Sequence, residues 1–453
     1  MSVCKNVSGA FPQSPLVDSG GEAERLNRGC FCITLDRDAL TEALNREVGS
    51  QDFAQRLAAS HPSLFSNVPA FIPSDTLIEM TRVVDAVETA ARLPDYREAV
   101  LSWAPPIARL DLGPVGALMS YDFHVTASGP KLIEVNTNAG GSFLNAALAR
   151  AQRTCCAEAH VPFEISPSQD FGSKIVDMFV AEWQRQRGSG RPTMIAIVDD
   201  APEEQYLFPE FRLAKALLEE YGFKTVIADA KKLLLDGKAL LIGSLPIDLV
   251  YNRLVDFALE EPPHAALQAA YVNGNVVVTP NPRAHALFAD KRNLTVLSSH
   301  TDNLKHWGLA QNHLDVLRAS VPTTVIVSPD NVDALWRDRR NLFFKPTRGH
   351  GSKAAYRGDK VTRKVWAEII GGEYVAQSYA APGTRGVQLD ETLAELKVDV
   401  RLYTFAGTVL LAAARLYQGQ TTNMRTPGGG FAPILEVSKP LECSFGSLRK
   451  SFT

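Results

Sequence analysis

The sequence predicts an α+β protein of two or three domains, and three observations lead to this prediction. The chain has 453 residues, which is more than a single hydrophobic core usually serves. Residues 192–229 have the strand–helix–strand pattern of a parallel α/β unit. From about residue 270, by contrast, short strands follow one another with glycine-rich loops and few helices between them, which is typical of an antiparallel sheet.

The composition is that of an ordinary globular protein, with 45% hydrophobic residues, 21% charged residues and a formal net charge of −3. This charge gives no support for binding to nucleic acid or to a membrane surface. No apolar run approaches the roughly 20 residues of a membrane-spanning helix, and the N-terminus lacks a signal-peptide pattern. The six cysteines form neither a CxxC pair nor a disulfide ladder, so we expect reduced thiols and a cytoplasmic protein.

The N-terminal third is expected to be mainly helical. Residues 1–28 are rich in Ser, Gly and Pro and are expected to form a poorly ordered lead. We take residues 29–187 as a helical region that also carries a hairpin. Its most secure helix starts at Pro73 with Ser74 as the expected cap, because apolar residues recur at helical spacing at Leu77, Met80, Val84, Val87 and Ala91.

The hairpin of this region is expected to consist of two strands, residues 117–125 and 131–136, joined by the turn-prone sequence Ala-Ser-Gly-Pro. The second strand, KLIEVN, is followed by TNAGGS, in which two glycines loosen the backbone. A helix rich in Ala and Leu is expected next, over residues 143–157. A charge and an amide interrupt the otherwise apolar second strand, and this interruption needs a reason.

Residues 188–265 are predicted to form a small Rossmann-like unit. TMIAIV has the pattern of a buried strand, EFRLAKALLEEYG of an amphipathic helix that ends at Gly222, and KTVIAD and DLVYNRL of two further strands. The unit has neither GxGxxG after its first strand nor a Walker-type loop, so we expect no dinucleotide site there. The strand-rich part follows as residues 266–440, with residues 441–453 as a tail.

The first group of candidate functional residues lies in the hairpin. Glu134 and Asn136 alternate with core residues and therefore point to the same face of their strand. A turn near Ser128 and Gly129 places Asp122 opposite them, about 5 Å away across the hairpin. Two carboxylates and an amide oxygen form an all-oxygen ligand set that suits Mg²⁺. The alternative is a solvated strand end that carries no metal.

The second group lies in NLFFKPTRGHGSKAAYRG, where a lysine ends an apolar strand and a basic, glycine-rich loop follows. Glycines let backbone amides approach phosphate oxygens, and a strand-held lysine can reach them as a point charge. The candidate phosphate-binding residues are Lys345, Arg348, Gly349, Gly351 and Lys353. The alternative is an exposed hairpin loop with no ligand.

Two weaker candidates complete the set. In EYVAQSYAAPG, backbone groups of Ala376, Gln377 and Ser378 could meet a purine edge. In ARLYQGQTTNMRTPGGGF, three polar residues precede a run of glycines, and arginine is suited to capture of carboxylate or phosphate. These residues are Arg415, Asn423 and Arg425. The alternative for this segment is a flexible surface loop.

Other polar residues of these strands are assigned structural roles. Arg401 shares a strand face with Asp399, which makes the two candidates for an ion pair. His124 and His285 have no partner at the spacing of a metal site, so we expect them to be structural.

Taken in order, these motifs resemble those of the ATP-grasp ligases. LFFKPTRGHGS, YVAQSY, VDVRLYTFAG and AAARLYQG with TNMRTPGGG are similar to that family's lysine strand and glycine lid, adenine hinge and central strands. The acidic strand comes last in most such enzymes, but here it lies far upstream of Lys345. That order is similar to the eukaryotic-type glutathione synthetases, which are circularly permuted. The resemblance implies a circularly permuted ATP-grasp fold with a small Rossmann-like α/β domain and an N-terminal helical region.

The resemblance also implies roles for individual residues. Asp122, Glu134 and Asn136 would hold Mg²⁺, while Lys345 and a second lysine, Lys291 in HALFADKRNL, would bind the phosphates of ATP. The segment Ala376–Ser378 would meet the adenine. Arg425, with Arg415, would act on the substrate carboxylate or acyl phosphate, and Asn423 would contribute to the nucleotide site.

The expected activity is therefore that of an ATP-dependent carboxylate–amine ligase, which joins two small molecules through an acyl phosphate. The alternatives are a phosphotransferase that uses the same ATP site and a nucleotide-binding regulator without activity. The permuted family is commonly dimeric, so a homodimer is a further expectation.

Two positions depart from the family pattern. The family has a metal-binding glutamate in a KPxxE sequence, whereas this chain has Gly349, followed by His350. Where the family has an arginine two residues before the hairpin aspartate, this chain has Ser120. The sequence therefore supports the use of ATP better than it supports glutathione as the product.

Overall fold

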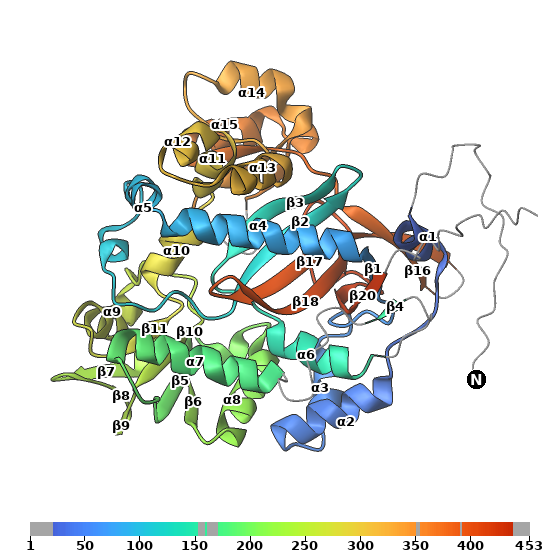
Figure 1. Cartoon of the computed structure of the whole chain (residues 1–453). Helices are drawn as coiled ribbons and strands as arrows, with labels where there is room; N and C mark the ends of the chain where they lie inside the picture. The colour runs from blue at the N-terminus through green and yellow to red at the C-terminus, as the bar shows by residue number, and fades with distance from the viewer. Residues whose placement is uncertain (1–20, 153–158, 161–170, 350–353, 390–391, 438–453) are drawn as a thin grey trace, which may run out of the picture.

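The structure is a computed structural model that describes residues 21–152, 159–160, 171–349, 354–389 and 392–437. Figure 1 shows three regions around a central antiparallel sheet: a helical cap with a small sheet at the top, a parallel sheet with its helices at the lower left, and N-terminal helices below. In the described part of the chain, no helix is long and apolar enough to cross a membrane.

The central sheet joins two distant parts of the sequence. Its strand order is β19-β18-β17-β2-β3, with β16 also paired to β17. The expected hairpin is confirmed as β2 and β3, and β17 pairs antiparallel with β2, so that Arg401 lies opposite Asp122. The strands are β2 (Met119–Thr126), β3 (Gly129–Asn136), β16 (Gly383–Leu389), β17 (Thr392–Phe405), β18 (Thr408–Tyr417) and β19 (Gly430–Ala432).

A second antiparallel sheet carries the lysine strand. Its order is β12-β15-β13-β14, and one face packs on α14 and α15 around Phe344, Trp366 and Ile369. The other face is turned toward the central hairpin. The elements are β12 (Thr324–Ile326), β13 (Leu342–Pro346), β14 (Tyr356–Arg357), β15 (Tyr374–Ser378), α14 (Val332–Asp338) and α15 (Arg363–Gly371).

The Rossmann-like unit is confirmed as a parallel sheet of order β11-β10-β5-β6. Helices α7 and α8 cover one face and α9 covers the other, as the alternation of buried residues along the strands requires. The sheet continues past the expected boundary at residue 265, because β11 pairs with β10. The elements are β5 (Met194–Asp199), β6 (Lys224–Asp229), β10 (Leu249–Asn252), β11 (Val277–Thr279), α7 (Phe171–Arg187), α8 (Phe208–Glu220) and α9 (Ala265–Val272).

The N-terminal region is helical, as expected, but two details differ. The end of the expected disordered lead belongs to α1 (Glu22–Gly29), which buries Leu26 against Phe71. In α4 (Ser74–Arg92) the cap position is Pro73, and the Ser74 hydroxyl donates to the Val437 carbonyl instead of capping the helix. The predicted apolar stripe of α4 is buried throughout.

Further elements of this part are α2 (Arg37–Val48), α3 (Phe53–Ser60), β1 (Ala70–Pro73), α5 (Pro94–Leu101), α6 (Ser142–Arg150), β4 (Ala159–His160) and β20 (Ile434–Val437). Helix α6 starts one residue earlier than expected and ends at Arg150, while the expected continuation over residues 153–157 lies outside the described residues. A small excursion of the Rossmann-like unit forms β7 (Leu233–Asp236), β8 (Ala239–Ile242) and β9 (Leu245–Pro246).

The expectation of few helices after residue 270 was wrong for the segment between β11 and β12. Asn281 caps the first of its helices by accepting a hydrogen bond from the Ala284 amide, and Pro282 occupies the first turn. These signals were present in the sequence and were overlooked. The helices are α10 (Pro282–Phe288), α11 (Asn293–Ser298), α12 (Thr301–His306) and α13 (Gln311–Ser320).

Candidate functional site

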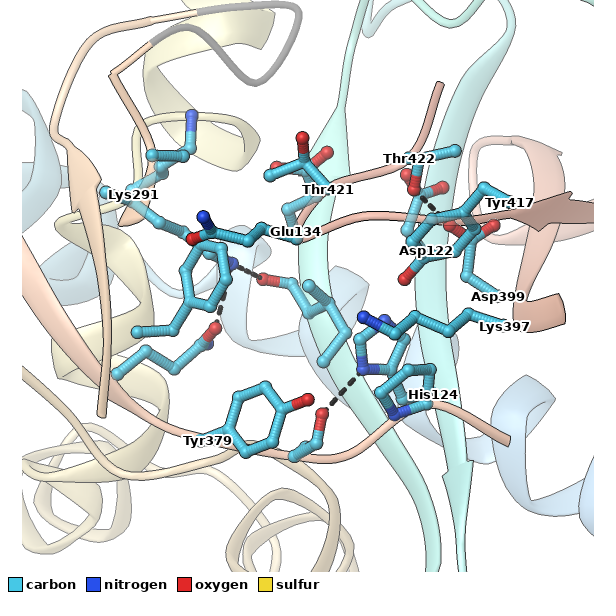
Figure 2. A pocket seen from close by; sticks show the side chains of 18 of the residues that line it. Asp122, His124, Glu134, Lys291, Tyr379, Lys397, Asp399, Tyr417, Thr421 and Thr422 are labelled. Atoms are coloured by element: carbon cyan, nitrogen blue, oxygen red, sulfur yellow. Dashed lines mark hydrogen bonds between the residues drawn. The ribbon is translucent and has the colours of Figure 1, made fainter. Parts of the chain in front are cut away.

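A cavity lies between the central hairpin and the sheet that carries the lysine strand. Its walls come from β2, β3, β13, β15, β17 and β18, together with the segment after β18. Figure 2 shows Lys291 at the left of the cavity, Glu134 near its centre, and Asp122, Asp399, Tyr417 and Thr422 grouped at the right. Of the predicted site residues, the cavity is lined by Asp122, Glu134, Asn136, Lys291, Lys345, Gly349, Gln377, Ser378 and Arg415.

The convergence predicted for the hairpin is confirmed. Asp122 and Glu134 are direct partners across β2 and β3, next to a bulge in the register. The Asn136 side-chain amide donates to Asp122 Oδ2 at 3.1 Å and to Glu134 Oε1 at 3.3 Å. Strand alternation and the turn position were sufficient to predict this cluster because both are local properties of the sequence.

Two arginines donate hydrogen bonds to the carboxylate of Asp122. Arg401 binds both of its oxygens, at 2.7 and 2.6 Å, and Arg415 binds Oδ2 at 2.8 Å. Burial alone would raise the pKa of Asp122, but the two guanidinium groups outweigh it and hold that pKa well below the usual range. The expected Arg401–Asp399 pair is not formed, because Asp399 instead accepts from Arg415 Nε at 2.6 Å.

The donor set fits a divalent cation at Glu134 and Asn136 better than at Asp122. All the hydrogen bonds to Asp122 come from Arg401, Arg415, Asn136 and Ser120, so its lone pairs are already used. Glu134 accepts a single hydrogen bond from Asn136 and faces the cavity. Burial opposes its ionisation, yet Lys291 and Lys345 lower the pKa of its carboxyl. The assignment of all three residues to magnesium stays a prediction.

Lys345 is the best defined cation of the site. Its ammonium donates to the Ile133 carbonyl and to Gln377 Oε1, both at 2.8 Å, which ties β13 to the hairpin and to β15. Burial lowers the pKa of Lys345 to about 8, with Glu134 acting in the opposite direction. Lys291 reaches the same cavity and donates to the Gly349 carbonyl at 2.9 Å.

The segment expected to meet a purine is present, but its residues divide between two faces of β15. Gln377 and Ser378 line the cavity, and Tyr379, Ala380 and Pro382 continue the lining. Ala376 points away and is buried in the core beside Phe344. The prediction for Ala376 is therefore limited to a contact of its backbone with a ligand.

The basic loop after β13 is only partly described. Gly349 lines the cavity, but Arg348 donates to the Trp103 carbonyl at 2.9 Å and does not contribute to the lining. Gly351 and Lys353 lie outside the described residues, so their predicted contacts with phosphate stay predictions.

The two residues predicted on the segment after β18 lie outside the cavity lining. Asn423 holds the local turn by donating to the Gln418 carbonyl and accepting from the Arg425 amide and the Thr426 hydroxyl. The Arg425 side chain is exposed. Thr421 and Thr422 line the cavity in their place, and the Thr422 hydroxyl donates to Asp399.

Sequence reasoning missed several residues of the site. His124 was assigned a structural role, yet it lines the cavity and donates from Nδ1 to the Ala380 carbonyl at 2.7 Å. Burial lowers its pKa, which favours the neutral ring. It stands two residues after Asp122, so strand alternation could have identified it. The same alternation, counted back from Arg401 by two and four residues, identifies Asp399 and Lys397, which also line the cavity.

A second group of buried charges lies behind the turn at Gly140 and Gly141. Arg253 donates to the Ala139 carbonyl at 3.2 Å, but its Nε has no partner among the described residues. Glu210 accepts from the Ser142 hydroxyl at 3.1 Å, and its Oε2 is likewise without one. The turn needs glycine, because a Cβ at Gly141 would come within 2.2 Å of Phe431, and its φ of 98° is left-handed.

No protein-family model and no curated protein matches this sequence. Among solved structures, a glutathione synthetase-like effector from Globodera pallida has a TM-score of 0.54 and 13% identity, over 89% of this chain and 99% of that one. A candidate gamma-glutamylcysteine synthetase from Methylobacillus flagellatus KT has a TM-score of 0.46 and 9% identity, over 81% and 89%. D-alanyl-alanine synthetase A from Vibrio cholerae has a TM-score of 0.28 and 14% identity, over 47% and 68%.

The likeness to the Globodera protein shows the fold, and the two structures with TM-scores below 0.5 add no argument. The resemblance to glutathione synthetase-like ATP-grasp proteins that the order of the motifs predicted is therefore confirmed at the level of the fold. The circular permutation stays a prediction.

Proposed function

We propose that this chain is an ATP-dependent carboxylate–amine ligase that forms an amide through an acyl phosphate. One observation carries the proposal: the buried ammonium of Lys345, the carboxylate of Glu134 and the amide of Asn136 line the same cavity, one wall of which continues into β15. Such a cavity has cationic and metal-binding groups at one end and a strand edge suited to a flat base at the other. The glutathione synthetase-like fold supports this use of it.

In the proposed reaction, a carboxylate oxygen of the acid attacks the γ-phosphorus of ATP, and the bond from that phosphorus to the bridging oxygen of ADP breaks. The amine nitrogen then attacks the acyl carbon. A C–N bond forms, the C–O bond to phosphate breaks, and the amine loses its proton as phosphate leaves. The protein has to position the reactants and neutralise charge, and it needs no nucleophile of its own.

Each residue of the cavity has a part in that task. Lys345 and Lys291 bind the phosphates of the substrate ATP. Glu134 and Asn136 hold Mg²⁺, which when bound would neutralise charge on the phosphate oxygens. Asp122 and Asp399 accept hydrogen bonds from Arg415 and orient it in the cavity lining, where it would bind the transferred phosphoryl group. Arg425 would reach the acid only after a movement of its loop.

The acid substrate is best accommodated near Arg253. This guanidinium is buried, forms no ion pair within the described part of the chain, and keeps an unsatisfied Nε beside the Gly140 turn. A carboxylate is the partner such a group lacks. The neighbouring carboxyl of Glu210, whose pKa burial raises, offers an acceptor for an amine or a hydroxyl.

The decisive experiment combines ADP release with an isotope label. The protein would be incubated with MgATP and panels of amino acids, dipeptides and polyamines, and ADP would be measured. For an active pair, ¹⁸O in the acid carboxylate should appear in the released phosphate. ADP formation with an acid alone and a stable phosphorylated product would favour a phosphotransferase. ATP binding without ADP formation for any pair would contradict the ligase.

The site assignment has its own test in Glu134→Gln. The substitution keeps the size of the side chain but removes its charge, so we expect about tenfold weaker MgATP binding and a larger loss of turnover. Glu42→Gln, on the exposed surface of α2, is the matched control. Unchanged MgATP affinity in the Glu134 variant would show that the metal site lies elsewhere.

A further inference from the structure

A leucine side chain lies beside the guanidinium group that is proposed to bind the acid. Arg253 Nη1 donates to the Ala139 carbonyl and to the Tyr251 hydroxyl, both at 3.2 Å, while Nη2 donates to no residue that the structure describes. A Cβ built at Gly140 would lie 3.5 Å from Arg253 Nη2 and 2.4 Å from Leu207 Cδ1. Leu207 and the unused edge of the guanidinium group are therefore close together at the Gly140 turn.

The Gly140 turn connects this place with the cavity. The Gly140 carbonyl accepts a hydrogen bond from Arg401 Nη1 at 3.2 Å, and Arg401 binds Asp122 in the cavity wall. Arg253, by contrast, is 7% exposed and does not line the cavity. A carboxylate needs hydrogen-bond donors when it leaves water, and the apolar side chain of Leu207 offers none. An acid that approaches Arg253 along this turn therefore has to displace Leu207.

The preceding residue, Tyr206, fixes the position of Leu207 by three contacts. Its carbonyl accepts a hydrogen bond from His61 Nε2 at 2.8 Å, and the two rings lie edge to face with 4.3 Å between their centroids. Its hydroxyl donates to the Met424 carbonyl at 3.2 Å. Met424 precedes the exposed Arg425 in the segment after β18. Tyr206 therefore ties Leu207 both to the end of α3 and to the loop that carries Arg425.

We infer that Leu207 is a gate that controls the access of the acid to Arg253. Tyr206 couples this gate to the loop that carries Arg425. The inference rests on the proposed acid site and adds a residue that decides when the site can be filled. While Tyr206 is bonded to Met424, Leu207 covers Arg253 and Arg425 stays in solvent. A movement of the loop breaks that hydrogen bond and frees Leu207, so the acid enters in the same step in which Arg425 can approach it.

The gate can be tested without a known substrate, by labelling the full chain with phenylglyoxal, which reacts with accessible guanidinium groups. Peptide mass spectrometry would give the labelling rate of Arg253, with the exposed Arg425 as the internal reference. This rate follows the fraction of molecules whose gate is open. Leu207→Ala should raise it about tenfold, because the packing of a partly buried leucine is lost. Leu234→Ala, at an exposed leucine of β7, is the matched control and should leave the rate unchanged.

A second variant tests the coupling and does not disturb the packing of Leu207. Tyr206→Phe loses only the hydrogen bond to Met424, so the labelling rate of Arg253 should rise about threefold. A labelling rate of Arg253 that equals the wild-type rate in both variants would overturn the inference.

Kinetics separate the gate from the proposed function. For an acid and an amine that release ADP, Leu207→Ala should lower the KM for the acid about threefold to tenfold and leave the KM for MgATP unchanged. A higher KM for the acid would overturn the inference, because it would show that Leu207 binds the acid instead of covering its site. Faster labelling of Arg253 without ADP release for any pair would support the gate and contradict the ligase.

Discussion

Two places in this molecule gather buried charges at the edge of a sheet, and they differ in whether the protein satisfies them by itself. In the cavity wall, Glu134 accepts one hydrogen bond, from Asn136, and the buried Nε2 of Gln377 has no acceptor among the described residues. At the carboxyl edge of the parallel sheet, His264 is fully buried with Nε2 at 2.9 Å from Asp200 and Nδ1 at 2.7 Å from Asp256.

The second place illustrates why a cluster of ligating residues is not enough for a site. Asp200, Glu261 and His264 present ligand atoms within 4.8 Å of one another, as a metal site would. Both nitrogens of the imidazole are nevertheless committed to carboxylates. Burial would lower the pKa of His264, but the hydrogen bonds to Asp200 and Asp256 outweigh it and raise that pKa. The ring therefore acts as a charged clamp between loops, whereas the cavity is arranged for a ligand.

The largest expected effect is on stability, from His264→Ala. Removing the ring takes the partner from Asp256, which is mostly buried, and from Asp200, whose side chain is 40% exposed. The loss of unfolding free energy should therefore exceed that of an exposed pair and approach about 3 kcal/mol, the lower end for a fully buried pair. MgATP affinity should not change. Denaturant unfolding and calorimetry would measure the two quantities. His313→Ala, whose ring pairs with the exposed Asp85, is the control and should lose far less stability. Loss of nucleotide binding in a folded His264 variant would contradict the distinction between a structural cluster at His264 and a separate binding site in the cavity.

The pH dependence of stability tests the same clamp. The folded state raises the pKa of His264, so its contribution is complete below the unfolded-state pKa of about 6.5 and is lost as pH rises through the folded-state value. The stability difference between wild type and His264→Ala should therefore shrink as the pH increases. A difference that grows with pH would contradict the assignment of a charged ring.

The next largest effect is expected from Lys345→Met, and it should fall on binding. The variant loses a charged donor to phosphate, which corresponds to roughly tenfold to hundredfold weaker MgATP binding. Stability should be unchanged or higher, because a buried charge has been removed. Lys364→Met, on the exposed face of α15, is the control. A folded Lys345 variant with wild-type affinity would remove the main support for the phosphate site.

A smaller effect is expected from pH on nucleotide binding. Burial lowers the pKa of Lys345 to about 8, so this cation is lost as pH rises above that value. If only the protonated form binds phosphate, MgATP affinity should fall about fivefold between pH 8 and pH 9. Lys345→Met should show no such step, and calorimetry across this range would measure both proteins. A step that survives in the variant would have to come from another group.

The smallest effect is expected from Thr422→Val. The variant loses the hydrogen bond to Asp399 that ties the segment after β18 to the cavity wall, and about threefold weaker MgATP binding should result. Thr421→Val, which changes a neighbouring residue of the same wall, should have less effect, because its side chain forms no hydrogen bond with the residues that the structure describes. Equal effects of the two variants would show that the hydrogen bond between Thr422 and Asp399 does not contribute to MgATP binding.

Local sequence patterns predicted the parts of this protein whose geometry is set within a few residues. The apolar stripe of α4, the β2–β3 hairpin and the strand–helix–strand unit follow from periodicity, and the meeting of Asp122, Glu134 and Asn136 follows from alternation and one turn. The order of the motifs along the chain predicted the fold. The helices between β11 and β12 were not predicted because their capping residues were overlooked, although the sequence contains those residues.

Only the tertiary structure decided which charges meet. Arg401 pairs with Asp122 and not with Asp399 because β17 lies beside β2, an arrangement between segments 279 positions apart that no local pattern encodes. The same packing turns Arg348 toward Trp103, commits Asp122 to arginines, and buries the Nε2 of Gln377 without an acceptor in the described part of the chain. The sequence by itself determined the strands and the chemistry available on them, and the register between distant strands determined which of those groups face the cavity.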